Sequence, residues 1–322
     1  MERLSDPFRD PAGALASLKA RVGSLSDKLK VAKLRRDVLA QEPDMSFRGG
    51  DRTTLAELQG LGFSPGFIDG FFRPFLGGVF LERALETSSL LFRYYFRCFS
   101  AGDATLPARG MQRLPELLAA PLEDRITLES PATAVSAKDV SLGGGATINA
   151  DFVVVAVDGR SAATLFPDVP EVKFKSTVTS YFASEHLPLS GRRLILDGEG
   201  EGPANHVAVV SEVAPEYAPS GAHLISVSGV GAHARDEDGF RAGVRDQLAR
   251  WFGPSVASWH HLKTYRIPDA LPVHEPGSLT GRPGAGQRPD GVFVAGDYVE
   301  FGAIQGALRS GRKVAEAILD RR

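Results

Sequence analysis

A buried strand followed by a helix, close to the C-terminus, is the feature that most limits how this chain can fold. Residues 291–295 form a short apolar run of β-branched and aromatic side chains, which predicts a buried strand. Gly296 and Asp297 end that run, and from Ala303 the apolar residues recur at helical spacing as far as Leu319. The simplest interpretation is an ordinary βα unit that closes a sheet.

The loop of this unit also carries groups that suit a cofactor with hydroxyls and a polar ring. Asp297 follows the strand, and a carboxylate at the carboxyl end of a strand can accept hydrogen bonds from sugar-like hydroxyls. The first helical turn offers backbone N–H groups and a partial positive charge to an electron-rich ring. The residues alone leave both interpretations open, because the pattern is loose.

Residues 291–311 resemble the C-terminal flavin motif of the FAD-dependent amine oxidase, phytoene desaturase and protoporphyrinogen oxidase superfamily. The resemblance implies FAD as the cofactor and hydride transfer from a substrate to flavin N5. It implies that Gly296 and Asp297 meet the ribityl chain, and that the backbone of Ile304, Gln305 and Gly306 faces the flavin pyrimidine edge. A helix dipole there would stabilise the reduced ring by ~0.3–2 kcal/mol.

Composition indicates a globular protein and excludes several classes. The chain has 322 residues, 43% hydrophobic and 24% charged, which is enough for one large or two ordinary domains. A net charge of -2 gives no footprint for nucleic acid. The single cysteine, Cys98, and an N-terminus without an apolar signal segment favour the cytoplasm. The histidines show no ligand spacing, so we predict no metal.

Residues 1–106 are predicted to be mostly helical. A helix capped by Ser26 and Asp27 should run to about Gln41, with Leu25 and Leu29 among its inward side chains. Its other face carries basic residues: Lys28, Lys30, Lys33, Arg35 and Arg36. This face either touches an anionic membrane surface or is simply solvated, and solvated basic faces are the commoner case.

Helix caps and aromatic side chains follow. Thr54-x-x-Glu57 predicts a capping box, and Ser64 before Pro65 predicts another helix start. Residues 63–99 are crowded with aromatics at helical spacing, which indicates a core or the wall of an apolar tunnel. Residues 71–80 resemble the helical substrate-domain insert of bacterial desaturase-like members. That resemblance implies a large apolar substrate, such as an isoprenoid or a tetrapyrrole.

The next stretch resembles the middle of the FAD-binding domain, residues 107–170. Residues 106–111 resemble the family's Gly-Met turn, which implies that Gly110 and Met111 lie beside the flavin where the substrate enters. Hairpin signals and the apolar run 152–157 come next. By resemblance, the backbone of Ala132 meets the adenine. A plain loop and a plain hairpin with one sheet strand are the alternatives.

Residues 171–286 contain a series of predicted strands and one predicted helix at 239–252. They are predicted to be the antiparallel-sheet part of the substrate domain. Residues 287–322 then return to the FAD-binding domain. By resemblance, the end of the sheet segment comes back to the flavin, so Tyr265, Leu271 and Pro272 are predicted to line the substrate. Packing alone is the alternative.

One expected signature is missing from the sequence. A strand–Gly-x-Gly-x-x-Gly–helix normally holds the FAD pyrophosphate, and the nearest match is Gly229-x-Gly231-x-x-Ala234. Three carboxylates follow it at 236–238 and would repel a diphosphate, so we reject it. The open explanations are an incomplete reading frame, a separate N-terminal FAD-binding polypeptide, or a remnant that no longer binds FAD.

These patterns together predict an α/β and α+β protein. It would combine a partial Rossmann-like FAD-binding domain, without the N-terminal βαβ unit, with a substrate domain of helices and an antiparallel sheet. The predicted function is an FAD-dependent oxidoreductase acting on a small-molecule apolar substrate. The alternative is a non-catalytic module that binds an apolar ligand or a partner.

Overall fold

The computed structural model describes residues 19–166, 172–280 and 284–321, and in addition Glu2, Leu4, Asp10 and Ser17. The chain divides into two compact units, each made of two stretches of sequence. Unit 1 comprises residues 1–114 and 175–270, and unit 2 comprises residues 115–174 and 271–322. The four-part division expected from the sequence stays a prediction.

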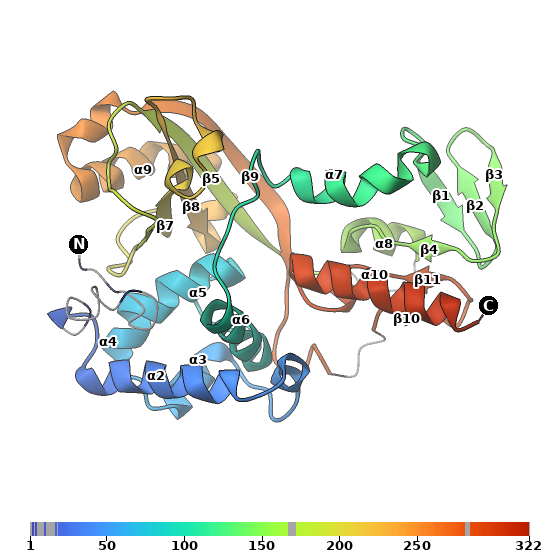
Figure 1. Ribbon diagram of the computed structural model, residues 1–322, viewed down its shortest axis with the longest axis horizontal. Helices are drawn as coiled ribbons and strands as arrows, with labels where there is room; N and C mark the ends of the chain where they lie inside the picture. Colours follow the sequence, from blue (N-terminus) through green and yellow to red (C-terminus); the bar gives the residue numbers. More distant parts are fainter. Residues whose placement is uncertain are drawn as a thin grey trace. The chain divides into compact units, whose positions relative to one another are not determined.

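Helices build the first part of unit 1 (Figure 1). They are α2 (Leu25–Leu39), η1 (Pro43–Phe47), α3 (Thr54–Gly60), α4 (Pro65–Phe67), η2 (Ile68–Phe72), α5 (Arg73–Phe80) and α6 (Ser89–Ala101). Phe72, Phe80 and Phe92 are fully buried, and the Phe72 and Phe92 rings meet edge to face at 6.2 Å. Most of the aromatic stretch is therefore core, as aromatic spacing of this kind usually indicates.

The start of α2 differs from the prediction. Ser24, and not Ser26, is the N-cap, and its hydroxyl accepts from the Asp27 N–H. Leu25 and Leu29 are 60% and 64% exposed, so the prediction that they face inward was wrong. Asp27 is buried instead, because its carboxylate accepts hydrogen bonds from Ser24 and from Ser64, which caps α4. The face of α2 that carries Asp27, and not the face that carries Leu25 and Leu29, is therefore buried.

The basic residues of α2 are engaged within the protein. Lys28 and Lys30 donate to the carbonyls of Ala20 and Gly62, and Arg35 donates to Ser100 O. Lys33 and Arg36 both pair with Asp37. Both alternatives for this face, solvation and contact with an anionic membrane surface, stay predictions.

The capping box predicted at Thr54 and Glu57 is also displaced by one residue. Thr53 is the N-cap of α3 and accepts from the Ala56 N–H at 3.1 Å. Glu57 does not close the box. Its buried carboxylate pairs with Arg52 and with Arg93. The sequence pattern predicts that the Glu57 carboxylate caps α3, but this carboxylate forms the two ion pairs instead.

A five-stranded sheet completes unit 1, in the order β6-β7-β8-β5-β9. Its strands are β5 (Phe174–Ser184), β6 (Leu194–Leu196), β7 (His206–Val209), β8 (His223–Val230) and β9 (His260–Pro272). The pairs β6–β7, β7–β8 and β8–β5 are antiparallel, which confirms the predicted antiparallel sheet. Helix α9 (Glu237–Phe252) packs Val244 and Leu248 against Phe182 and Ile225, so it covers one face of this sheet.

Unit 2 holds the C-terminal βα unit and the hairpin region. Helix α7 (Arg113–Ala119) and the turn η3 (Ala120–Arg125) precede an antiparallel sheet of β1 (Ala132–Val135), β2 (Asp139–Leu142) and β3 (Thr147–Asn149). A second sheet, ordered β10-β11-β4, contains β4 (Val154–Val155), β10 (Gly286–Gln287) and β11 (Phe293–Val294). The predicted strands at 152–157 and 291–295 thus form, but shorter than expected.

Helices cover both faces of the β4–β11 pair (Figure 1). Val292 and Val294 pack with Ala162 of α8 (Gly159–Leu165). Phe293 packs on the opposite side with Val314 of α10 (Ile304–Leu319). Alternate side chains of one strand therefore enter two layers, which explains why the run is apolar throughout. Of the helices in the described ranges, none is long and apolar enough to cross a membrane.

Candidate functional site

Two parallel strands of unit 2 run toward two carboxylates. β4 and β11 pair in parallel, with the N–H of Phe293 donating to Val153 O at 2.9 Å. Asp158 follows the first strand and Asp297 follows the second. The carboxyl ends of parallel strands are where α/β sheets usually bind ligands. This edge of the sheet is therefore the candidate cofactor site.

Asp297 is half-buried at the end of β11. Burial raises the pKa of its carboxyl, the backbone N–H groups of Tyr298 and of Asp297 itself lower it, and nearby Asp158 raises it again; the net pKa is raised. Burial, Asp158 and Asp297 also raise the pKa of the Tyr298 hydroxyl to about 12. Hydroxyl donors from a ligand would relieve the penalty on this carboxylate.

Asp158 is a residue that the sequence analysis missed. It is the N-cap of α8 and accepts from the N–H groups of Arg160 and Ser161, both at 3.0 Å. The Ser161 hydroxyl donates to it at 2.6 Å and is the main cause of its lowered pKa. An aspartate directly after an apolar run and before a helix was the available signal.

The Gly296–Asp297 turn is tied to α10 by Ser310. The buried Ser310 hydroxyl accepts from the Gly296 N–H at 2.8 Å and donates to Ala307 O at 2.6 Å. A Cβ on Gly296 would collide with the Tyr298 ring, so only glycine fits this turn. The strand end and the second helical turn thus form one connected unit.

The first turn of α10 presents its backbone. Ala303 occupies the N-cap position and has no polar side chain with which to cap the helix. Ile304 and Gln305 are exposed, whereas Gly306 is buried, where a Cβ would collide with the Phe301 carbonyl oxygen. Uncapped N–H groups at a helix start suit an anionic or electron-rich ligand edge. The donor set therefore fits the flavin pyrimidine edge, as the resemblance implies.

The loop before α10 is held from two sides. The Gly302 N–H donates to Nε2 of the buried His274 at 2.8 Å. Glu300 pairs with Arg309 at 2.8 Å and with Lys313 at 2.6 Å. His274 had not been singled out from the sequence, since its partner is 28 positions away.

The structure brings some predicted site residues together. Leu271 and Pro272, at the end of β9, pack against Gly302 in the same loop that leads to the 304–306 turn. Ala132 is exposed on β1, an outer strand of its sheet. Within unit 2 these residues accompany Asp297; their contacts with substrate or cofactor stay predictions.

The remaining predicted residues lie in unit 1. Gly110 has a φ of 102°, which favours glycine, and it turns the chain before the exposed Met111. Tyr265 is exposed on β9, and its ring meets Tyr181 edge to face at 6.1 Å. Their proposed proximity to flavin or substrate stays a prediction.

The rejected glycine motif does not form a phosphate-binding turn. The turn η6 (Gly231–Arg235) follows β8, and α9 starts only at Glu237 behind the N-cap Asp236. A Cβ on Gly229 would collide with Phe240, so that glycine serves packing. Within the part of the chain that the structure describes, no group of three or more His, Cys, Asp or Glu side chains is placed to hold a metal ion.

Comparison with known families decides the assignment. The family described as flavin-containing amine oxidoreductase matches residues 4–319, almost the whole chain. The chain belongs to this family. It is accordingly an FAD-dependent oxidoreductase in the general sense, and the family, cofactor and enzyme class predicted from the sequence are confirmed.

Several solved structures share the fold at low sequence identity. An oxidoreductase from Methanosarcina mazei is 17% identical, with a TM-score of 0.72 over 91% of this chain and 73% of that one. A protoporphyrinogen oxidase-like protein from Exiguobacterium sp. 255-15 is 16% identical, with a TM-score of 0.66 over 95% and 75%. A putrescine oxidase bound to putrescine is 16% identical, with a TM-score of 0.65 over 92% and 76%. A search of curated proteins found no match.

Proposed function

We propose that this oxidoreductase removes a hydride from a large apolar substrate, such as an isoprenoid or a tetrapyrrole. When bound, FAD supplies the two-electron acceptor at its N5 atom, and the substrate leaves oxidised by two electrons. The exposed apolar side chains of β9, Leu262, Tyr265 and Ile267, support an apolar substrate over a small charged amine.

The residues of unit 2 hold and orient the cofactor in this proposal. Asp297 accepts hydrogen bonds from the ribityl hydroxyls, and the backbone N–H groups of Ile304, Gln305 and Gly306 face the pyrimidine edge. The observation that carries the proposal is the pairing of a half-buried carboxylate at a strand end with an uncapped helix start, tied together by Ser310. These β–loop–α elements act as part of a Rossmann-like FAD-binding domain.

A direct test replaces the anchoring carboxylate. Asp297→Ala should weaken FAD binding about tenfold or more, because it removes charge-assisted hydrogen bonds. FAD fluorescence quenching measures the dissociation constant. Asp151→Ala is the matched control, since Asp151 is an exposed carboxylate just before β4, away from the carboxyl end of that strand. Equal FAD affinity in the Asp297→Ala and Asp151→Ala proteins would contradict the anchoring role.

We further propose that the phosphates of FAD are bound by a strand–Gly-x-Gly-x-x-Gly–helix unit outside residues 1–322, either upstream in the same reading frame or in a separate FAD-binding piece. The support is that residues 1–322 contain only the rejected match at Gly229, which the turn η6 follows. The same observation favours a second candidate, a non-catalytic module that binds an apolar ligand. Yellow protein with bound flavin would support the enzyme, whereas colourless protein that binds a long-chain lipid would support the module.

A further inference from the structure

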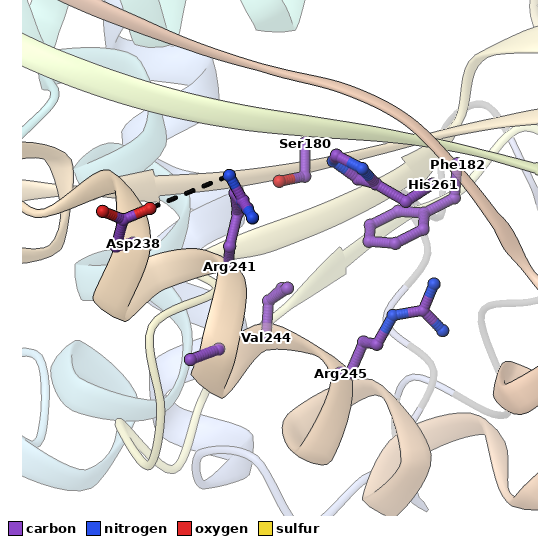
Figure 2. A pocket seen from close by; sticks show the side chains of 8 residues that line it. Ser180, Phe182, Asp238, Arg241, Val244, Arg245 and His261 are labelled. Carbon is purple, nitrogen blue, oxygen red and sulfur yellow. Dashed lines mark ion pairs between the residues drawn. The ribbon is translucent and has the colours of Figure 1, made fainter.

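A cavity of about 430 Å³ lies within unit 1, between α9 and the strands β5 and β9 (Figure 2). Ser180 and Phe182 come from β5 and His261 comes from β9. Arg241 and Arg245 come from α9, one helical turn apart. All of these residues belong to unit 1, so the cavity shares no residue with the strand ends of unit 2.

The two arginines are held differently. Arg245 donates to Trp259 O at 3.0 Å and to Val256 O at 3.5 Å, and its guanidinium carbon lies 5.4 Å from the centre of the Phe182 ring. Arg241 is 54% exposed and lies 3.7 Å from the carboxylate of Asp238, which is 94% exposed. Solvent screens such an exposed pair strongly, so Arg241 keeps most of its capacity to bind another anion.

Polar groups of the sheet complete the cavity. The buried Ser180 hydroxyl lies 2.6 Å from the Thr264 hydroxyl, which lies 2.9 Å from Nε2 of His261. Figure 2 shows the Arg241 guanidinium and the His261 ring on either side of Ser180. Burial lowers the pKa of His261, and the positive charges of Arg241, Arg245 and His260 lower it further. The ring therefore lies in a positive potential.

We propose that this cavity binds a small organic molecule of the phosphate-monoester class through Arg241, Arg245 and His261. Arg241, Arg245 and His261 line the cavity from two turns of α9 and from β9, and arginine side chains are the preferred partners of phosphate oxygens. Phe182 and Val244 provide an apolar wall for the organic part. The volume matches sites for metabolite-sized ligands. The proposal does not depend on FAD or on the oxidised substrate.

The test uses phenyl phosphate as the probe on the full chain. The imidazole resonances of His261, assigned by their loss in His261→Gln, are followed by NMR while sodium chloride keeps the ionic strength constant. We expect a saturable shift with phenyl phosphate and a weaker response to benzoate. No saturable shift, the same shift with chloride alone, or tighter binding of benzoate would overturn the proposal.

Variants of opposite effect sharpen this test. Arg241→Gln should weaken phenyl phosphate binding about tenfold, and Asp238→Asn should tighten it, because the competing carboxylate is removed. Arg250→Gln is the matched control: it removes an arginine of the same helix that donates to Glu201 O and does not line the cavity. Equal affinities in all three variants would overturn the proposal. Arg241 is exposed, so its replacement leaves the fold intact.

Discussion

Asp27 shows how one buried carboxylate can organise two helix starts. It accepts from the backbone and the hydroxyl of both Ser24 and Ser64, at 2.7 to 2.9 Å. Burial acts to raise its pKa, but these hydrogen bonds outweigh burial and hold the pKa well below its usual value of 3.8. The stabilisation is therefore complete above pH 3.8 and is lost as the pH falls from there toward the folded-state pKa.

Replacing this carboxylate should destabilise the protein. Asp27→Asn is expected to lower the free energy of unfolding by about 2 kcal/mol, because an amide cannot accept all four hydrogen bonds. Urea denaturation at pH 7 measures the change. Asp37→Asn on the same helix is the control and should have little effect, since its pairs with Lys33 and Arg36 are exposed. Equal effects of the two variants would show that Asp27 adds no more than a surface charge.

A second residue-scale prediction concerns the two strand-end carboxylates. The charge of Asp158 contributes to the raised pKa of Asp297. Asp158→Asn keeps the N-cap acceptor for α8 but removes that charge, so the pKa of Asp297 should fall. The pKa of Asp297 is measured from its carboxyl carbon chemical shift in an NMR pH titration. An unchanged pKa would show that the charge of Asp158 does not act on Asp297.

The sequence reveals site residues that are neighbours along the chain and misses those that act over a long sequence distance. Gly296, Asp297 and the start of α10 follow each other along the chain, so a pattern reveals them. Ser310 and His274 act on backbone groups 14 and 28 positions away, and nothing in their own neighbourhood signals that contact. Asp27 was assigned to a cap by spacing, whereas its partner Ser64 is 37 positions away.

At the scale of elements, α10 offers a matched pair of glycines. A Cβ at Gly306 would collide with the Phe301 carbonyl oxygen, whereas a Cβ at Gly311 meets nothing within 4 Å. Gly306→Ala should therefore destabilise the protein by about 1–3 kcal/mol through overpacking. Gly311→Ala should stabilise it by about 0.5–1 kcal/mol, because alanine favours the helix. Thermal and urea unfolding of both variants measure the difference. Destabilisation by Gly311→Ala would contradict the assigned helix surface.

Elements were predicted better than their ends. Periodicity located α9, α10 and the antiparallel sheet, because burial on one face imposes a repeat on the sequence. The predicted N-terminal ends were wrong by two residues in α2 and by one residue in α3. In both helices the carboxylate expected at the cap has distant partners: Ser64 binds Asp27, and Arg93 pairs with Glu57. Tertiary contacts decided those boundaries.

At the scale of the whole molecule, unit 2 carries apolar surface beside the elements that we propose face the cofactor. β4 is an outer strand of its sheet, and Val154, Val157, Ile304 and Leu308 are exposed on β4, after it and on α10. Exposed apolar side chains beside a strand edge are typical of a surface that another segment covers. The proposed FAD-binding piece, with its own strand and Gly-x-Gly-x-x-Gly turn, has the chemistry to pair with that edge.

Adding such a piece in trans should therefore do two things at once. It should tighten FAD binding at least about tenfold, because its helix N-terminus binds the pyrophosphate. It should also protect the amide of Val154, which points to the free edge of β4, from hydrogen exchange. FAD fluorescence and hydrogen-exchange mass spectrometry measure these effects. A piece with the motif glycines replaced by valine is the control: it should keep the protection but lose the gain in FAD affinity. Equal FAD affinity with either piece, or with neither, would contradict a phosphate site supplied from a separate polypeptide.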